Sequence, residues 1–171
     1  DPVTLETGGL HLEATLLAGQ KTGLYLDQLD TYARIASLAP GKRVLDCFSN
    51  QGGFGLACAR AGAASVTCVD ISAEAIAAVR RNAELNDLKT ETVEANAFDY
   101  LKNCDEQFDL IILDPPSFTR SKKALRDAMR GYKEIHLRAL KLLDHDGYLA
   151  TFSCSHHVSR ELFLNNVRDA A

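Results

Sequence analysis

Short apolar runs alternate with longer amphipathic segments along most of the 171-residue chain. An apolar run bounded by turn residues is typical of a buried strand, and apolar positions three and four apart are typical of a helix. Strands are expected from Arg43, at Ser65–Asp70, at 91–95, at Phe108–Leu113 and, after a turn at Asp146-Gly147, at 148–152. Helices are expected at 29–38, 55–64, from Ser72 to about 86, at about 122–143 and from Arg160.

This alternation predicts an α/β domain with a mainly parallel, doubly wound sheet and helices on both faces. Before it, polar and apolar residues alternate around Gly8-Gly9, which predicts a β-hairpin with a two-residue turn. Residues 20–28 are too polar to belong to the hydrophobic core. They are equally well interpreted as a plain loop or as a functional segment. We therefore expect a hairpin and lead-in segment at 1–30 and the α/β domain at 31–171, as a piece of a longer protein.

The composition is that of a soluble, intracellular protein. The net charge is −4, so any contact with nucleic acid depends on a local basic patch. No run is apolar enough to span a membrane, and no secretory signal pattern opens the chain. Five cysteines without a CxxC pair indicate reduced thiols and a cytoplasmic location. His156 and His157 lack zinc-ligand spacing, so no metal is expected.

A polar residue that could bind a ligand or take part in a reaction lies at or just after the end of each expected strand. These residues are Asp46, Asp70, Asn96, Asp114 and Cys154. Right-handed crossovers place the carboxyl ends of parallel strands at one edge of the sheet, and ligands of open α/β sheets bind in the crevice there. The sequence therefore predicts one ligand site at this edge.

The first strand runs into the glycine-rich segment 46–55, DCFSNQGGFG, and then into a helix. This order lets backbone N–H groups face a cofactor, although glycines alone are weak evidence because they also serve turns. The acid Asp46 repels a pyrophosphate but can face the ammonium and sulfonium of S-adenosylmethionine. Asp70 follows at the spacing of a ribose-binding acid, and a helix-capping role for it is equally open.

The fourth strand ends in Asp114-Pro115-Pro116-Ser117-Phe118. Two consecutive prolines make a rigid loop, and a rigid loop that presents a carboxylate and an aromatic ring suits a flat substrate. Cys154 follows the fifth strand between Ser153 and Ser155, where an inert buried thiol is the usual alternative to a reactive one.

These residues together resemble the class I S-adenosylmethionine-dependent methyltransferases. More narrowly, the chain resembles the bacterial large-subunit ribosomal RNA cytosine-C5 methyltransferases that carry an RNA-binding PUA domain. The motifs that carry the resemblance are QKTGLYLDQ (20–28), DCFSNQGG (46–53), DPPSF (114–118), RGYK (130–133) and FSCSHH (152–157). The resemblance implies a Rossmann-like sheet. It also implies a PUA domain before the hairpin and two more strands after the last helix, which we expect in the longer protein outside these 171 residues.

The resemblance also implies roles for individual residues. Cys154 would be the nucleophile, Asp114 would hold the cytosine edge, and Ser117 stands where a better-known cytosine-C5 family has a second cysteine. Residues implied in cofactor binding are Asp46, Phe48, Ser49, Gly52, Gly53, Asp70, Ile71, Asn96, Ala97 and Asp114. Lys21, Thr22, Asp27 and Gln28 would line the same crevice. Many relatives carry Asp in place of Asn96, and a homodimer stays open.

The expected partner is ribosomal RNA. Residues predicted to contact it are Pro115, Pro116, Phe118, Lys122, Lys123, Arg126 and Arg130. The basic members cluster with Arg120 and Lys133 after the proline loop, with Asp127 the only acid among them. A run of basic residues usually forms a solvent-exposed helix face. Because this run follows the expected substrate pocket, we favour contact with the phosphates of RNA.

Two other functions compete with the cytosine-directed one. A related methyltransferase family with the same prolines modifies guanine in ribosomal RNA and has Asn where this chain has Cys154. An NAD-binding Rossmann domain is the alternative from another class, and Asp46 before the glycines and the DPPSF loop disfavour it.

Overall fold

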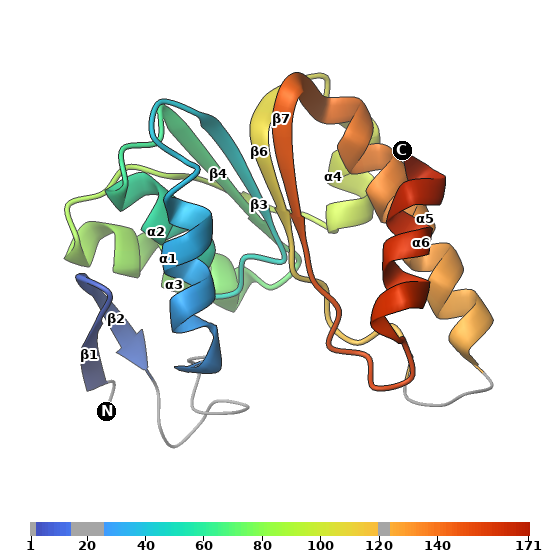
Figure 1. Cartoon of the computed structure of the whole chain (residues 1–171). Coiled ribbons are helices and arrows are strands. Elements are labelled where there is room, and N and C mark those ends of the chain that lie inside the picture. Colours follow the sequence, from blue (N-terminus) through green and yellow to red (C-terminus); the bar gives the residue numbers. More distant parts are fainter. Residues whose placement is uncertain (1–2, 15–25, 120–123) are drawn as a thin grey trace.

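The computed structural model describes residues 3–14, 26–119 and 124–171. Five strands form one sheet with parallel pairing throughout, in the order β5-β4-β3-β6-β7. Their bounds are β3 Arg43–Cys47, β4 Ser65–Asp70, β5 Glu91–Glu94, β6 Phe108–Leu113 and β7 Leu143–Thr151. Helices cover both faces of this sheet (Figure 1), so the predicted doubly wound α/β fold is confirmed.

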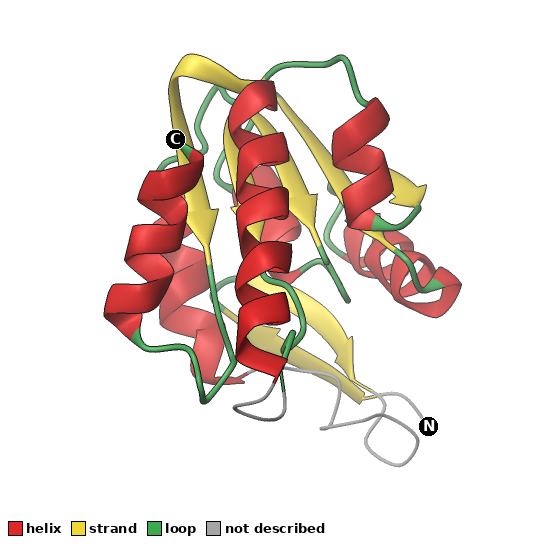
Figure 2. Ribbon diagram, turned by 90° about the vertical axis from the view of Figure 1, so that its right-hand side faces the viewer, coloured by secondary structure: helices red, strands yellow, loops and turns green. Residues whose placement is uncertain are grey.

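The helices divide between the two faces of the sheet (Figures 1 and 2). Their bounds are α1 Leu29–Ala36, α2 Gly53–Arg60, α3 Ala73–Leu85, α4 Ala97–Asn103, α5 Leu125–Leu142 and α6 Arg160–Ala170, with a 3-10 turn η2 at Leu26–Gln28 before α1. One core cluster joins the sheet to α1, α2 and α3, and another joins it to α4 and α5. Helix α6 packs outside, against α5. In the described part of the chain, no helix has the length and apolarity to cross a bilayer.

Strand β3 shows why the central strands read as continuous apolar runs. Val44 and Asp46 face the α2 side of the sheet, while Leu45 and Cys47 pack on the α4–α5 side. All four side chains are buried, because a parallel strand between two helical layers has no solvent face. The alternation also turns Asp46 toward α2, and this direction decides its role in the site.

Two parts of the fold differ from the expected elements. Helix α4 was missed, although Asn96 before an apolar-periodic stretch is an N-cap signal, and its Oδ1 accepts the N–H of Phe98 at 2.9 Å. The expected turn at Asp146-Gly147 was wrong, since both residues lie inside β7. There Phe108 pairs with Leu143 and Leu110 with Tyr148, so the residues between form an irregularity in the strand.

An arginine stabilises this irregular end of the sheet. The Arg43 guanidinium contacts Asp109 at 2.8 Å and Asp144 at 2.6 Å, and the Arg43 backbone N–H also donates to Asp109. These hydrogen bonds lower the pKa of Asp109 to about 2. One residue therefore joins the start of β3 to the start of β6 and to the extra residues of β7.

The predicted hairpin is confirmed. Strands β1 (Val3–Thr7) and β2 (Leu10–Ala14) pair antiparallel, and the two turn glycines have positive φ angles of 56° and 75°. Leu10 and Leu12 pack with residues of α2 and α3. The Asn82 side chain accepts the Glu13 N–H at 2.9 Å and donates to the Gln51 carbonyl at 3.1 Å. Asn82 thus joins the hairpin to the glycine-rich segment.

Replacing Asn82 by Ala should lower the free energy of unfolding by about 2 kcal/mol, because the part-buried Glu13 N–H and Gln51 carbonyl lose their partner and the completely buried Asn82 side chain is removed. Urea denaturation measures the change, and hydrogen exchange at the Glu13 amide should quicken. The exposed Asn103 at the end of α4 is the control, and Asn103→Ala should change stability by less than about 0.5 kcal/mol. Equal effects of the two variants would contradict the bridging role of Asn82.

Candidate functional site

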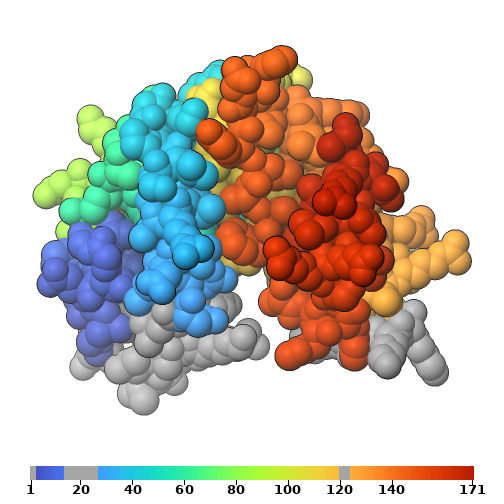
Figure 3. All heavy atoms as spheres, viewed as in Figure 1, coloured from blue at the N-terminus to red at the C-terminus, as the bar shows by residue number. Residues whose placement is uncertain are grey.

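The polar strand-end residues lie at one edge of the sheet, the lower edge in Figure 1, because all five strands run in the same direction. Figure 3 shows that the surface is hollowed at this edge, between the α1 side and the orange-red segment after β7. The residues placed there by the strands are Asp46, Asp70, Asn96, Asp114 and Cys154. The topology therefore gathers the candidates that the sequence predicted for one crevice.

The loop after β3 has an unusual backbone. Phe48, Asn50 and Gly52 have positive φ angles of 63°, 47° and 85°. Gly52 is the N-cap of α2, and its N–H donates to the Ser49 carbonyl at 2.7 Å. A Cβ on Gly55 would lie 2.5 Å from the Cys68 sulfur, so this position admits no side chain. The close approach brings the first turn of α2 against β3 and β4.

Asp46 is the most buried acid of the site, with 1% of its surface exposed. Its Oδ2 accepts the Gly55 N–H at 2.8 Å, and within the described chain its buried Oδ1 has no hydrogen-bond partner. Burial raises the pKa of Asp46 to about 7, with smaller contributions from the charges of Asp114 and Asp70. The hydroxyl of Ser49 is also buried without a partner there. Buried polar atoms are nearly always paired, so these two favour a ligand that donates hydrogen bonds.

Asp70 joins two segments of the crevice. One carboxylate oxygen accepts the Asn50 N–H and the other accepts the Ser72 N–H, each at 2.9 Å. Ser72, not Asp70, is the N-cap of α3, as its Oγ accepts from Ala75. Each oxygen keeps capacity for a further donor. Beside it Ile71 is 67% exposed, which leaves an apolar surface next to the carboxylate.

The side-chain oxygen of Asn96, a residue predicted to bind the cofactor, already accepts the Phe98 N–H as the cap of α4. Ala97, its neighbour in the same prediction, is buried with 4% exposure. The structure therefore gives Asn96 a local role in addition to any contact with a cofactor. The exposed edge of its side chain is the part that a ligand can reach.

The proline loop and the cysteine segment lie side by side. Strands β6 and β7 pair up to Leu113 and Thr151, so the residues that follow them are neighbours. Cys154 is an exposed residue, and its sulfur lies 3.8 Å from the Pro115 carbonyl oxygen. Burial raises the pKa of the neighbouring Asp114 to about 6, and the charge of Asp27 adds to the shift. Asp27 is thus close to the crevice, in η2.

Four hydroxyl groups connect these two segments. The Tyr132 hydroxyl lies 2.9 Å from the Ser153 Oγ and 3.2 Å from the Ser155 Oγ, and Ser155 is 3.1 Å from the Ser117 Oγ. Tyr132 is completely buried in α5. Because both neighbours of Cys154 bind one fixed hydroxyl, the cysteine between them is held outward. The sequence singled out Tyr132 in a motif without a role, since nothing local shows that α5 passes beneath this loop.

Phe118, a predicted substrate contact, packs against two other aromatic rings. Its ring packs against Tyr132 at 4.6 Å and Phe98 at 5.9 Å between centroids, and a Cβ on Gly131 would touch it at 3.4 Å. Phe118 is half-buried and contributes to the wall between α4 and α5. The exposed Pro116 and the buried Pro115 complete the loop.

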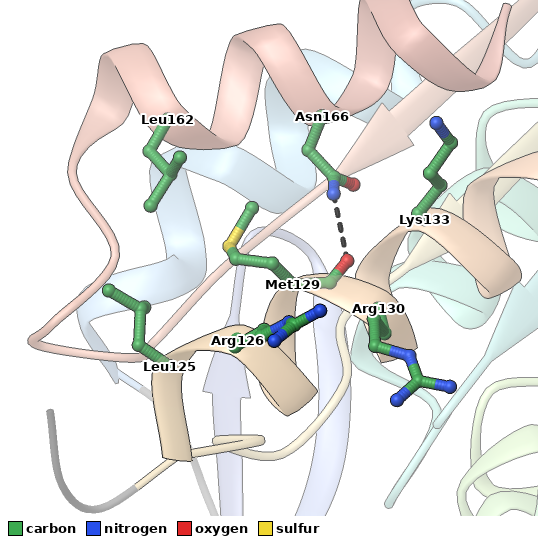
Figure 4. A pocket seen from close by; sticks show the side chains of 7 residues that line it. All are labelled: Leu125, Arg126, Met129, Arg130, Lys133, Leu162 and Asn166. Atoms are coloured by element: carbon green, nitrogen blue, oxygen red, sulfur yellow. Dashed lines mark hydrogen bonds between the residues drawn. The ribbon is translucent and has the colours of Figure 1, made fainter. Parts of the chain in front are cut away.

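The predicted basic residues are divided. Arg126 and Arg130 are exposed on α5 and line a cavity of about 590 Å³ between α5 and α6 (Figure 4). Arg120, Lys122 and Lys123 lie outside the described residues, as do Lys21 and Thr22 of the lead-in motif. No group of three metal-ligating side chains occurs within ranges 3–14, 26–119 and 124–171.

Comparison with known proteins gives the family. The methyltransferase small domain matches residues 20–170. Ribosomal RNA large subunit methyltransferase I of Shewanella frigidimarina is 43% identical over 99% of this chain and 44% of its own length. The Aeromonas salmonicida protein of the same name is 42% identical over 100% of this chain and 45% of its own length. The chain thus spans less than half the length of these curated relatives.

Solved structures agree in fold. The crystal structure of a methyltransferase candidate complexed with SAH (S-adenosylhomocysteine) superposes on this chain with a TM-score of 0.88 and 26% sequence identity. The match covers 99% of this chain and 46% of that protein's chain. The SAM-dependent methyltransferase from Agrobacterium tumefaciens superposes with a TM-score of 0.84 at 21% identity, over 99% of this chain and 57% of its own, which shows the fold alone. Since the family match covers most of the chain, the chain belongs to the methyltransferase small domain family.

Proposed function

We propose that this chain is the methylating domain of an S-adenosylmethionine-dependent RNA methyltransferase that forms 5-methylcytosine in large-subunit ribosomal RNA, in the cytoplasm. The observation that carries the proposal is the exposed residue Cys154, whose sulfur lies 3.8 Å from the carbonyl oxygen of Pro115, the residue after Asp114. A nucleophile and a carboxyl group then border one crevice. The relatives at 43% and 42% identity are named as ribosomal RNA large subunit methyltransferases, which supports RNA as the substrate.

The residues at the ends of β3 and β4 fit the cofactor. The buried Oδ1 of Asp46 and the hydroxyl of Ser49 lack partners in the described chain, and an ammonium group would give both a donor. Asp70 has capacity for ribose hydroxyls, and the exposed Ile71 offers an apolar surface to the adenine. The cofactor would supply an electrophilic methyl group on its sulfonium. The superposed structure with bound SAH supports this assignment.

Calorimetric titration above pH 7, where Asp46 is ionised, should show binding of S-adenosylhomocysteine and no binding of NAD, because the Asp46 carboxylate repels a pyrophosphate. Replacing Asp70 by Ala should weaken S-adenosylhomocysteine at least tenfold, since charge-assisted hydrogen bonds to the ribose are lost. Asp146→Ala removes a fully exposed acid in the irregular part of β7 and should leave affinity unchanged. Tight NAD binding would overturn the cofactor assignment and favour an oxidoreductase.

Affinity for S-adenosylhomocysteine should rise with pH. The pKa of Asp46 is about 7 in the free chain, and an ammonium beside the carboxylate lowers it, so binding releases a proton below pH 7. Affinity should therefore increase roughly tenfold from pH 6 to 7.5 and level off above. Asp46→Asn should bind weakly with no such rise between these pH values. A flat profile for the unmodified chain would show that Asp46 does not face the ammonium.

The site residues can activate cytosine. Carbon 5 is a poor nucleophile, and a Cys154 thiolate that adds to carbon 6 pushes an electron pair into the ring and makes carbon 5 nucleophilic. Asp114, whose pKa is raised to about 6, can donate a proton or hydrogen bond to N3, where this charge collects. After carbon 5 takes the methyl group, a base removes its proton and the carbon–sulfur bond breaks to restore the ring and the thiolate.

An RNA with 5-fluorocytosine at the target should become covalently attached to the protein. Fluorine cannot leave as a cation, so the carbon–sulfur bond to Cys154 persists after methyl transfer. The adduct, seen by denaturing electrophoresis and mass spectrometry, should require S-adenosylmethionine and be absent in Cys154→Ala. Cys104→Ala, at a half-buried cysteine after α4, should retain it. Near-normal methylation by Cys154→Ala would contradict the mechanism and favour a guanine-directed enzyme.

A further inference from the structure

The cavity of about 590 Å³ between α5 and α6, here called the α5–α6 cleft, is separate from the residues assigned to cofactor and catalysis. Its apolar lining comes from Leu125, Met129 and Leu162, and its charged lining comes from Arg126, Arg130 and Lys133. In Figure 4 the Met129 and Leu162 side chains point toward each other across the cleft. The cleft therefore combines an apolar floor with a basic rim.

Helical periodicity produces this arrangement. Arg126, Met129, Arg130 and Lys133 follow the i, i+3, i+4, i+7 spacing, which places them on one face of α5. Asn166 of α6 fixes the opposing wall, because its Nδ2 donates to the Met129 carbonyl at 2.8 Å and its Oδ1 lies 3.1 Å from the His136 Nδ1. The Asn166 amide is thus committed to the contact between helices. It joins the two helices that form the cleft.

The charge on the rim is largely uncompensated. Arg130 lies 3.8 Å from Asp127, but both side chains are about 80% exposed, so the pair contributes little. Within the described part of the chain, no acid forms an ion pair with Arg126 or Lys133. Three cations in one small area on a chain of net charge −4 favour a polyanionic partner.

The position of the cleft connects it to the crevice. Helix α5 follows the proline loop and α6 follows the Cys154 segment, so both helices start at the edge where the strands end (Figure 1). Polyanions that also carry flat apolar groups are single-stranded nucleic acids, whose bases stack or pack while cations bind the phosphates. A strand with its target base at Cys154 can continue over the start of α6.

We propose that the α5–α6 cleft binds a nucleotide that flanks the target base in single-stranded RNA. The base lies on Met129 and Leu162, and its phosphates contact Arg126, Arg130 and Lys133. The identity of the RNA as a methylation substrate rests on the proposed function. Because the Asn166 amide is already paired, the floor offers apolar contact without hydrogen-bond readout, so this position accepts any base.

Leu162→Glu tests the floor of the cleft, with Leu164→Glu as the matched control. Both leucines are exposed on α6, at 36% and 41%, and only Leu162 lines the cleft. Fluorescence anisotropy with a labelled single-stranded RNA should show about tenfold weaker binding for Leu162→Glu and little change for Leu164→Glu. Equal RNA affinity of the two variants would overturn the proposal.

Salt dependence tests the rim. Removing two phosphate contacts with Arg126→Ala and Lys133→Ala should reduce the slope of log K against log salt by about 1.4. Lys141→Ala with Arg168→Ala removes two cations from the last turns of the same helices and should leave the slope unchanged. An unchanged slope in the first double variant would also overturn the proposal.

Two further measurements separate the outcomes. The first is sedimentation of Leu162→Glu. If this variant lost a dimer but still bound RNA, the cleft would be a protein interface and the proposal would be contradicted. Methylation of ribosomal RNA and S-adenosylhomocysteine binding by the unmodified chain are measured in parallel. Cleft-dependent RNA binding without methylation would contradict the proposed function alone, and methylation without cleft dependence would contradict the cleft alone.

Discussion

The edge of the sheet at which the strands end depends on the buried carboxylate of Asp46. Burying a carboxylate to 1% exposure costs free energy of desolvation. The hydrogen bond that the Gly55 N–H donates to Asp46 offsets part of that cost. That hydrogen bond requires the first turn of α2 to approach β3 closely, which explains a glycine where a Cβ would lie 2.5 Å from the Cys68 sulfur. The second oxygen of Asp46 is buried with no hydrogen-bond partner in the described chain, which favours a ligand that donates a hydrogen bond.

The second half of the edge is organised by hydroxyl groups rather than by charge. A single buried tyrosine on α5 binds the serines on both sides of Cys154, and one of these serines also meets Ser117 in the proline loop. The arrangement connects the loops after β6 and β7, which carry Asp114 and Cys154. Both halves of the crevice thus depend on helices that pack against the sheet.

The sequence alone indicated the class of fold and the edge at which ligands bind. Strands such as Phe108–Leu113 are apolar throughout because they are buried on both faces, and this signal is local enough to recognise. Parallel connection then places Asp46, Asp70, Asp114 and Cys154 at one edge whatever the details of packing. The hairpin was equally predictable, since two adjacent glycines between alternating residues leave few other conformations.

Only the tertiary structure determined the contacts between segments that lie far apart in the chain. The Asn82 bridge to the hairpin, the hydroxyl contacts of Tyr132 and the α5–α6 cleft each join residues that no local pattern relates. Likewise the Phe118 ring packs against Phe98 of α4 and Tyr132 of α5, which are far from it in the chain. Periodicity and turn chemistry act over a few residues, so they determine elements and topology. Side-chain partners depend on how those elements pack, and packing is a property of the whole fold.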